Sequence, residues 1–282
     1  MAKYVTIQVA RRETPPAPQA PGEHCKKCNA SLAAGELERA LRVCPHCSYH
    51  YPLPAHERIA QLADKGSVGF IAEEVQAVDP LDFVDVKTYP ERLSTAKFET
   101  GLSEAFLAAL CDISGVPAAL GVLDFRFLGG SMGSVVGERF HRLARAAVEE
   151  RRPLVVVAGS GGARMQEGLF SLMQMAKTVV AVQMLATARL PYVAILTHPT
   201  TGGVFASFAT IADVIMAEPG AVMSFAGARI IEQTTREKLP PGFGSSESQL
   251  THGQVDMVVD RRQLRERLAL CLSFLMGGQT GG

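Results

Sequence analysis

The sequence contains no tryptophan, few aromatic residues, no excess charge of either sign and no long uninterrupted apolar run. Aromatic residues make up 6% of the 282 positions, and 28 Lys and Arg balance 28 Asp and Glu. This balance gives no overall attraction to nucleic acid or to an anionic membrane. No apolar run approaches about 18 residues, and residues 1–22 lack the apolar core of a signal peptide. The sequence therefore predicts a cytoplasmic globular protein without a membrane span.

The six cysteines are unevenly distributed, and four of them have the spacing C-x2-C-x15-C-x2-C. These four are Cys25, Cys28, Cys44 and Cys47. The spacing is typical of a four-thiolate zinc site rather than of a disulfide framework. Because four sulfurs complete a tetrahedron, we expect one structural Zn2+ ion with no open position for catalysis. Cys111 and Cys271 stand alone in apolar surroundings and are predicted to be small buried residues.

The basic residues of this zinc ribbon raise nucleic-acid binding as an alternative role. Lys26, Lys27, Arg39 and Arg42 lie in it, but three glutamates offset their charge. The ribbon also lacks a series of aromatic residues on which bases could stack. A lid or docking module for the larger domain is the preferred interpretation, with nucleic-acid binding as the weaker alternative.

The stretch 158–168, Ala-Gly-Ser-Gly-Gly-Ala-Arg-Met-Gln-Glu-Gly, is chemically the most informative. It follows an apolar run at 153–157 and precedes helix-forming residues at 165–188, so the sequence predicts a strand, a glycine turn and a helix. Free backbone N–H groups at such a turn bind a phosphate or a developing oxyanion. Neither the dinucleotide-binding spacing nor a P-loop lysine is present, which favours an oxyanion or acyl site. A tight packing turn is the remaining alternative.

From residue 104 onward, apolar strands alternate with glycine turns and helices. The predicted strands are 116–124, 153–157, 192–197 and 214–218, and the predicted helices are 138–150, 165–188 and a short one from 206. This alternation predicts an α/β domain with right-handed crossovers, whose ligand lies at the C-terminal ends of the strands. A second glycine turn, 199–203, is expected at that same edge. Before the domain, 55–62 is predicted to be helical and 78–86 to be a loop.

Together these motifs resemble the β subunits of the bacterial acetyl-CoA carboxylase carboxyltransferase. The resemblance covers residues 23–275 and includes two departures, His198 where the family pattern has Asp and Ala228 where it has Pro. The matching runs are the two CxxC pairs, 127–137, 160–168, 171–177, 199–204, 217–220, 225–227 and 231–240. The resemblance implies a crotonase-like (ClpP/crotonase) spiral of ββα units behind an N-terminal zinc ribbon.

The resemblance also implies an activity and its partners. The carboxyl group of carboxybiotin, held on a separate biotin carboxyl carrier protein, would be transferred to acetyl-CoA to give malonyl-CoA for fatty-acid synthesis. A dedicated α subunit in an α2β2 assembly and an ATP-using biotin carboxylase are implied, while neither an ATP cradle nor covalent biotin is expected on this chain. The alternatives are another acyl-CoA carboxylase or malonyl-CoA decarboxylase subunit of the same fold, and a zinc-ribbon nucleic-acid-binding regulator.

The glycine turns supply the predicted catalytic groups, as two separate oxyanion sites. Gly161, Gly162 and Ala163 are expected to hold the acyl-CoA thioester and its enolate, and Gly202 and Gly203 the other oxyanion. Which turn serves which carbonyl stays open. The predicted substrate-binding residues are Gly129, Gly130, Ser131, Met132, Gly133 and Arg164. For Arg164 the alternative to a CoA phosphate is an ion pair with Glu167, and for the three glycines it is a purely structural turn.

The predicted domain organisation has five parts. It comprises a flexible tail at 1–22, a zinc ribbon at 23–50, a connecting segment at 51–103 packed on the main domain, a carboxyltransferase domain at 104–275, and a C-terminal tail at 276–282.

Overall fold

The computed structural model describes residues 24–33 and 35–277. The tail predicted at 1–22 and residues 278–282 lie outside this part. Eight strands form one sheet in the order β1-β2-β3-β4-β5-β6-β8, with β7 paired to β5. They are β1 (Gly69–Ile71), β2 (Phe106–Ile113), β3 (Val116–Leu123), β4 (Leu154–Ser160), β5 (Tyr192–Thr201), β6 (Val214–Ala217), β7 (Met223–Ser224) and β8 (Met257–Val258). The first three strands pair antiparallel, and the pairs from β3 onward are parallel.

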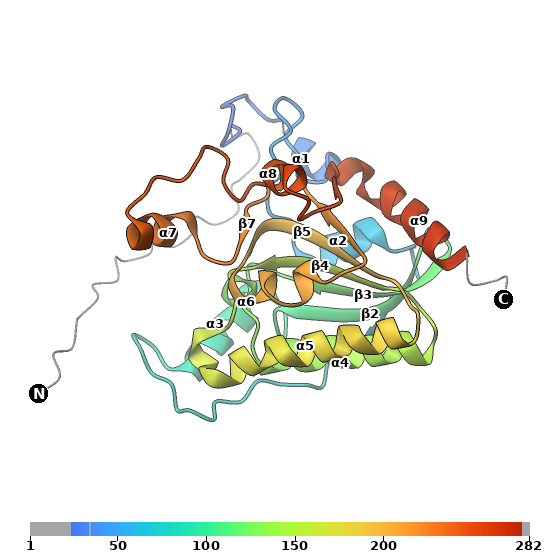
Figure 1. Cartoon of the computed structure of the whole chain (residues 1–282), viewed down its shortest axis with the longest axis horizontal. Coiled ribbons are helices and arrows are strands. Elements are labelled where there is room, and N and C mark those ends of the chain that lie inside the picture. The colour runs from blue at the N-terminus through green and yellow to red at the C-terminus, as the bar shows by residue number, and fades with distance from the viewer. Residues whose placement is uncertain (1–23, 34, 278–282) are drawn as a thin grey trace, which may run out of the picture.

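Helices cover both faces of this sheet (Figure 1). The longer ones are α2 (Ala55–Leu62), α3 (Tyr89–Thr100), α4 (Ser134–Glu149), α5 (Leu169–Thr187), α7 (Ala228–Thr235) and α9 (Arg261–Gly277). The shorter ones are α1 (Glu36–Arg39), α6 (Gly202–Phe205), α8 (Ser246–Thr251), and the 3-10 turns η1 (Leu128–Gly130), η2 (Met165–Glu167) and η3 (Phe208–Thr210). In Figure 1, α4 and α5 lie side by side below the sheet, whereas α2 and α9 contact β3 from the other side.

The central strands carry near-continuous apolar runs because helices cover them on both faces. All seven residues of β4 are buried, as are the first five of β5. Residues of the segment at 51–103, including Leu62, Tyr89 and Leu93, belong to the same hydrophobic core. The core therefore fixes the strand ends that carry the glycine turns.

The predicted α/β alternation is confirmed, with differences in the helices. The strand at 116–124, the helix at 55–62 and the loop at 78–86 lie where the sequence predicts them. The helix predicted from Met165 begins instead at Leu169, because η2 and Gly168 (φ 50°) interrupt it. No α-helix begins at 206 as predicted: α6 covers Gly202–Phe205, and only the 3-10 turn η3 (Phe208–Thr210) follows it. Strand β2 and helices α3 and α9 have no counterpart among the predicted elements.

Within the described part, α5 is the one helix whose length and composition would suit a membrane span. It pairs along α4, and Ser171, Gln174, Thr178, Ala181 and Leu185 form its buried face. Its opposite face is apolar and exposed.

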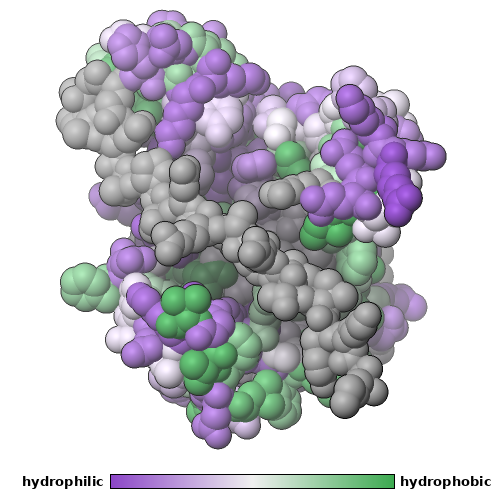
Figure 2. Space-filling view, turned by 90° about the vertical axis from the view of Figure 1, so that its left-hand side faces the viewer, coloured by the Kyte–Doolittle hydropathy of each residue, from purple (hydrophilic) through white to green (hydrophobic). Residues whose placement is uncertain are grey.

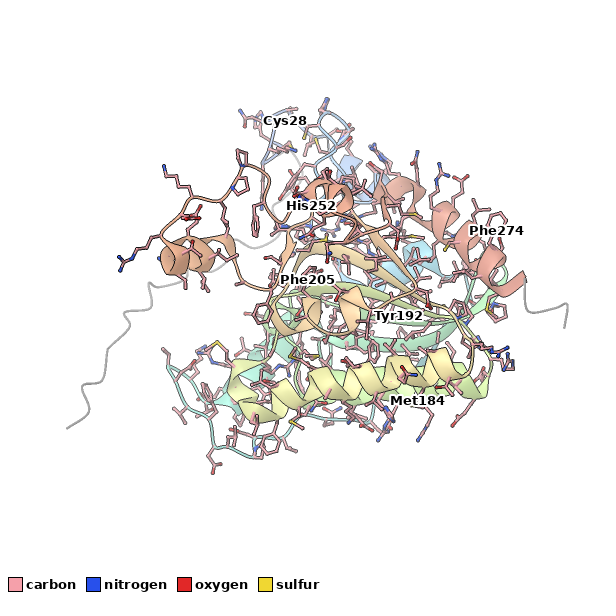
Figure 3. The ribbon with its side chains drawn as sticks, viewed as in Figure 1. Cys28, Met184, Tyr192, Phe205, His252 and Phe274 are labelled. Atoms are coloured by element: carbon pink, nitrogen blue, oxygen red, sulfur yellow. The ribbon has the colours of Figure 1, made fainter. Side chains whose placement is uncertain are left out.

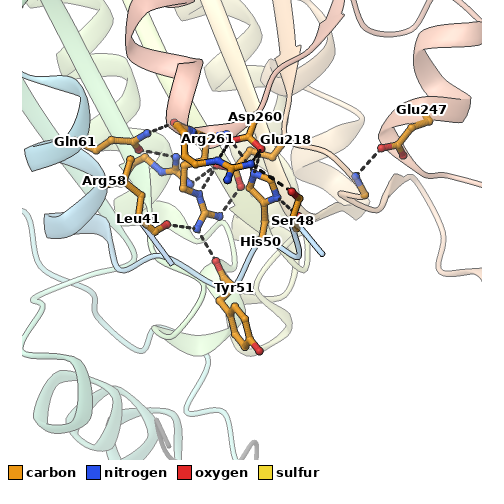
Figure 4. A network of polar contacts seen from close by, with 12 residues as sticks. Leu41, Ser48, His50, Tyr51, Arg58, Gln61, Glu218, Glu247, Asp260 and Arg261 are labelled. Carbon is orange, nitrogen blue, oxygen red and sulfur yellow. Dashed lines mark hydrogen bonds and ion pairs between the residues drawn. The ribbon is translucent and has the colours of Figure 1, made fainter. Parts of the chain in front are cut away.

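A buried ion cluster joins the four-cysteine module to the main domain (Figure 4). The Glu218 carboxylate accepts hydrogen bonds from Arg58 (2.7 Å) and from Arg261 (2.6 and 2.8 Å). Arg261 also donates to the backbone carbonyls of Leu41 (3.0 Å) and Tyr51 (2.8 Å), which flank the second cysteine pair. Glu218 thus fixes an arginine that holds the module in place.

Replacement of the Glu218 carboxylate is expected to lower the free energy of unfolding strongly at neutral pH and less in acid. Burial raises the pKa of Glu218, but attraction to Arg58 and hydrogen bonds from Arg261 outweigh burial and lower the pKa to about 2, from 4.5. The stabilisation, about 3 kcal/mol by linkage, is present above pH about 4.5 and is lost as the pH falls toward about 2. In urea denaturation, Glu218→Gln should therefore be destabilised at about pH 7 and approach the parent at about pH 3.

The matched control is Glu57→Gln, since Glu57 pairs with Arg42 at 2.8 Å but is partly exposed. It should lose less than about 1 kcal/mol at either pH. An equal gap for Glu218→Gln at both pH values would contradict the assigned charge state.

Candidate active site

The two glycine turns lie together because their strands are neighbours. Strands β4 and β5 pair in parallel from Leu154↔Tyr192, and their register shifts at Gly159 so that Ser160 pairs with Thr200. Hydroxyl groups join the strand ends, with Thr200 Oγ1 donating to the carbonyl of Ala158 (2.9 Å). Both chains therefore leave the sheet at one edge, where parallel α/β folds bind their ligands.

The backbones of the two turns are in direct contact. A Cβ atom on Gly162 (φ 112°) would lie 3.1 Å from the Cα of Gly202 and 3.3 Å from the nitrogen of Gly203. A Cβ atom on Gly203 would lie 3.5 Å from the Cβ of Ala163 and 3.1 Å from the sulfur of Met175. A side chain at Gly162 would push the turns apart, so this glycine is required for the contact, whereas a Cβ at Gly203 would require the Met175 side chain to shift.

Only some of the N–H groups in these turns are available to a ligand. The N–H of Gly161 donates to the carbonyl of Gly129 (2.9 Å), and that of Gly162 to Ser160 Oγ (3.0 Å). The N–H of Gly202 donates to the carbonyl of Phe225 (3.0 Å). Among the bonds of residues 35–277, none uses the N–H of Ala163 or of Gly203. Gly203 lies in the first turn of α6, where N–H groups lack helical partners.

These two free N–H donors belong to different turns, but Ala163 and Gly203 are neighbours in space. The sequence predicts one oxyanion site at each turn, and the structure places the two turns in contact. The assignment of an oxyanion to each turn stays a prediction. The helix predicted from Met165 does not begin directly behind the first turn, because η2 and Gly168 separate the turn from the start of α5. Two unbonded N–H groups therefore lie on neighbouring turns, and a pair of preorganised backbone donors is one means of stabilising a developing oxyanion.

The loop at 129–133 packs behind the first turn. Met132 pairs with Ala163 through two backbone bonds, from Met132 N–H to Gly162 (2.8 Å) and from Arg164 N–H to Met132 (3.0 Å). A Cβ on Gly130 would lie 2.1 Å from the carbonyl oxygen of Gly159, so close packing requires this glycine. Met132 is fully buried. These contacts support the structural alternative for the loop, and a role in CoA binding stays a prediction.

Arg164 lies entirely inside the protein, with 0% of its side chain exposed. It forms ion pairs with Glu104 (2.5 Å) and Glu167 (3.5 Å) and has no contact with solvent. Burial lowers the pKa of Arg164, but the attraction of Glu104 outweighs it and raises the pKa, so the guanidinium is charged. This geometry favours the ion-pair alternative over a contact with a CoA phosphate. Glu104 was not foreseen, because 60 positions separate it from Arg164.

His198 lies within the C-terminal part of β5 and precedes a cis bond to Pro199. Its Nδ1 accepts a hydrogen bond from the N–H of Val222 (3.2 Å), and burial lowers its pKa. The imidazole ring is thus engaged with the backbone of Val222. Ala228, the other departure, is the first residue of α7.

The four predicted metal ligands converge in the ribbon, where Cys28 is labelled in Figure 3. All four Sγ atoms lie within 4.8 Å of one another. The Cys25–Cys47 and Cys28–Cys44 sulfur distances are 3.7 and 3.9 Å. Bonds of about 2.3 Å to a tetrahedral zinc ion imply sulfur separations of about 3.8 Å. The four thiols therefore fit one metal ion. Cys111 is buried, and burial raises its pKa to about 12, as expected of an inert thiol.

Comparisons with known proteins identify the family of the chain. The model of the carboxyl transferase domain family matches residues 64–261. The acetyl-coenzyme A carboxylase carboxyl transferase subunit beta of a Thermus thermophilus strain is 55% identical over 90% of this chain and 89% of its own. The protein of that name from Rubrobacter xylanophilus is 52% identical over 89% of this chain and 96% of its own.

Solved structures share the fold at lower identity. The transcarboxylase 12S core, with methylmalonyl-coenzyme A bound, matches 79% of this chain and 41% of its own, with a TM-score of 0.66 and 24% identity. A Pseudomonas malonate decarboxylase hetero-tetramer matches 84% of this chain and 86% of its own, with a TM-score of 0.65 and 20% identity.

The family model identifies a carboxyl transferase domain, and the solved structures share its crotonase-like fold, which here is preceded by a four-cysteine ribbon. More narrowly, the chain belongs to the family of acetyl-coenzyme A carboxylase carboxyl transferase β subunits. The resemblance seen in the sequence is thereby confirmed.

Proposed function

We propose that this chain transfers the carboxyl group of carboxybiotin to acetyl-CoA, with the N–H groups of Ala163 and Gly203 as its oxyanion donors. The observation that carries this proposal is the contact between the two glycine turns, which places two unbonded N–H groups on adjacent residues. The chain is the β component of the carboxyltransferase, and malonyl-CoA is the product.

The reaction places negative charge on carbonyl oxygens twice. The N–C bond of carboxybiotin breaks, which leaves charge on the ureido oxygen, and the methyl carbon of acetyl-CoA loses a proton to form an enolate. The freed biotin nitrogen accepts that proton, and the enolate carbon then bonds to the released carboxyl group. Two N–H donors fixed at the oxygen lower the barrier without a protein nucleophile, since they need no reorganisation.

One donor pair stabilises one oxyanion, so a second site is required for the other carbonyl. We infer that the α subunit supplies it, and that the active centre lies between unlike subunits in an α2β2 assembly. This inference replaces the idea that each turn of this chain holds its own oxyanion. It leaves open whether the pair at Ala163 and Gly203 holds the thioester or the ureido oxygen.

The exposed face of α5 is the surface we assign to subunit contact. It extends from η2 along the helix, and its apolar residues are largely solvent-exposed. They are Met165, Leu169, Phe170, Leu172, Met173, Val179 and Val180. Hydrophobic residues also gather on the lower half of the face in Figure 2. A contiguous apolar surface of this kind usually marks a protein interface.

A charge in this face should prevent assembly. Leu172 is 51% exposed in the isolated chain, so Leu172→Glu is expected to fold, yet burial of its carboxylate would weaken α binding at least about 100-fold. Co-purification and size-exclusion chromatography with the α subunit measure this. Phe274→Glu, at an exposed site on α9 (Figure 3), is the control and should assemble normally. Normal assembly of both variants would remove α5 from the interface.

The remaining partners belong to the same proposal. The four thiols hold one structural zinc ion, and a separate biotin carboxyl carrier protein delivers carboxybiotin after an ATP-dependent biotin carboxylase has loaded it. The cytoplasm is the proposed location, since free thiolates of this kind persist in reducing compartments. We also propose the division of the chain into a ribbon, a connecting segment and a carboxyltransferase domain.

Reconstitution tests the function. The chain purified with its α subunit should form malonyl-CoA from acetyl-CoA and a carboxylated carrier protein, and the chain alone should not, because half of the centre would be missing. An assembled pair that forms no malonyl-CoA would refute the proposal.

A further inference from the structure

We propose that Tyr89, Arg164 and Glu167 are positioning residues that hold the N–H of Ala163 at the oxyanion site. This inference rests on the proposed function of that N–H group. The three side chains and their partner Glu104 form a polar cluster that is buried inside the protein.

Arg164 links the first glycine turn to the loop at 129–133. Arg164 directly follows Ala163 in the chain, and its backbone N–H donates to the carbonyl of Met132 (3.0 Å). Its side chain reaches the same loop again, donating to the hydroxyl (3.1 Å) and the carbonyl (2.9 Å) of Ser131. Ala163 is therefore held between two neighbours bonded to Met132. Its N–H shares a peptide plane with the Gly162 carbonyl that Met132 binds, and Arg164 anchors the following peptide unit to the same residue.

Glu167 fixes the end of the segment that follows the first glycine turn. One carboxylate oxygen accepts the N–H of Ser134 (2.6 Å), the first residue of α4. A Cβ on Gly133 would lie 2.3 Å from Glu167 Oε1, so this glycine makes room for the carboxylate. The negative charge also suits a helix N-terminus. Glu167 thus ties the residues after the turn to the start of α4.

Tyr89 connects the side chains of Arg164 and Glu167. Its hydroxyl donates to Glu167 Oε1 (2.6 Å) and accepts from an Arg164 N–H (3.0 Å). Burial raises the pKa of Tyr89, so the hydroxyl keeps its proton. A capping box of Thr88 and Glu91 fixes the first turn of α3, where Tyr89 lies. A helix distant in sequence thereby sets the geometry of the turn.

The charged groups of the cluster pair with one another. Arg164 pairs with Glu104 at 2.5 Å, and Glu104 also accepts the N–H of Ala105 (2.7 Å). With these bonds satisfied and 0% of the Arg164 side chain exposed, the cluster acts on the reaction through the backbone of Ala163. Small displacements of such a donor lower the rate of the chemical step more than substrate binding, because the oxyanion develops only in the transition state.

Tyr89→Phe tests this inference in the αβ complex. It removes the hydroxyl that connects Arg164 to Glu167 without changing the ring. We expect kcat to fall about 10-fold, and the KM for acetyl-CoA to change less than about twofold. Rates are divided by the measured stoichiometry of acetyl-CoA binding, so that a loss of folded protein is not counted as a loss of rate.

Tyr192→Phe is the matched control. Tyr192 is equally buried in β5, and its hydroxyl donates to the carbonyl of Phe208 (2.9 Å), away from the turns. It should lower the melting temperature comparably and leave kcat unchanged. Equal kcat values for the parent complex and Tyr89→Phe would overturn the positioning role, as would an equal loss of kcat in both variants. Inactivity of the parent complex would instead refute the proposed function itself.

Discussion

A Gly203→Val variant is expected to lose carboxyl transfer by about 10²–10³-fold while still binding the α subunit. The new side chain would start 3.1 Å from the sulfur of Met175 and 3.5 Å from the Cβ of Ala163. Relief of this crowding moves the N–H of Gly203 away from that of Ala163, so the donor pair is lost. The steady-state rate of malonyl-CoA formation by the purified complex measures the effect.

Gly69→Val is the control for this substitution. Gly69 lies in the edge strand β1, and the nearest atom to an added Cβ is the carbonyl oxygen of Leu110 at 3.9 Å. Its complex should retain the parent rate. Unchanged turnover of Gly203→Val, in a complex of normal composition, would exclude Gly203 from the oxyanion site.

The second large effect is expected from loss of the metal. Cys44 is fully buried in the ribbon, and its replacement by serine removes one of four sulfurs from the cluster. A structural zinc ion contributes about 10–16 kcal/mol to the folding of a small module, more than so small a core can replace. Cys44→Ser is therefore expected to contain no zinc and to have a ribbon open to proteolysis, while the main domain keeps its cooperative unfolding transition.

Metal analysis by mass spectrometry, together with limited proteolysis, measures this outcome. Cys111→Ala should keep one zinc ion per chain, because Cys111 lies in β2 outside the cluster. A full complement of zinc in Cys44→Ser, with a protease-resistant ribbon, would contradict the four-thiolate site.

Local patterns predicted the elements that have strong local signals. The CxxC spacing identified the four cysteines that converge, and the apolar runs identified strands β3, β4, β5 and β6. Helix α5 was predicted to begin at Met165 rather than at Leu169, because Met165 to Glu167 are good helix formers by composition. Their actual geometry is set by distant contacts of Glu167 with Tyr89 and Ser134.

The relation between the two turns was beyond the reach of local patterns. Gly162 and Gly202 are far apart in the sequence, and their contact depends on the parallel register of β4 and β5 and on its shift at Gly159. The sequence pointed to the two glycine turns, but it could not show which of their N–H groups the fold already uses. The bonds of Gly161, Gly162 and Gly202 remove those donors and leave Ala163 and Gly203.

Arg164 illustrates the same limit for charged residues. Its position after a glycine turn suits a phosphate ligand, and only the fold shows that Glu104 and Tyr89 surround it. A charge in a motif is therefore a weak guide to a ligand until its burial is known.

The most direct test of the joined oxyanion site is a structure of the αβ complex with a stable acetyl-CoA analogue, and another with a biotin derivative. In one of the two, the carbonyl oxygen should lie about 2.7–3.1 Å from both Ala163 N and Gly203 N. If the oxygens of both ligands are bound elsewhere, and neither approaches these two nitrogens, the two turns do not form the oxyanion site.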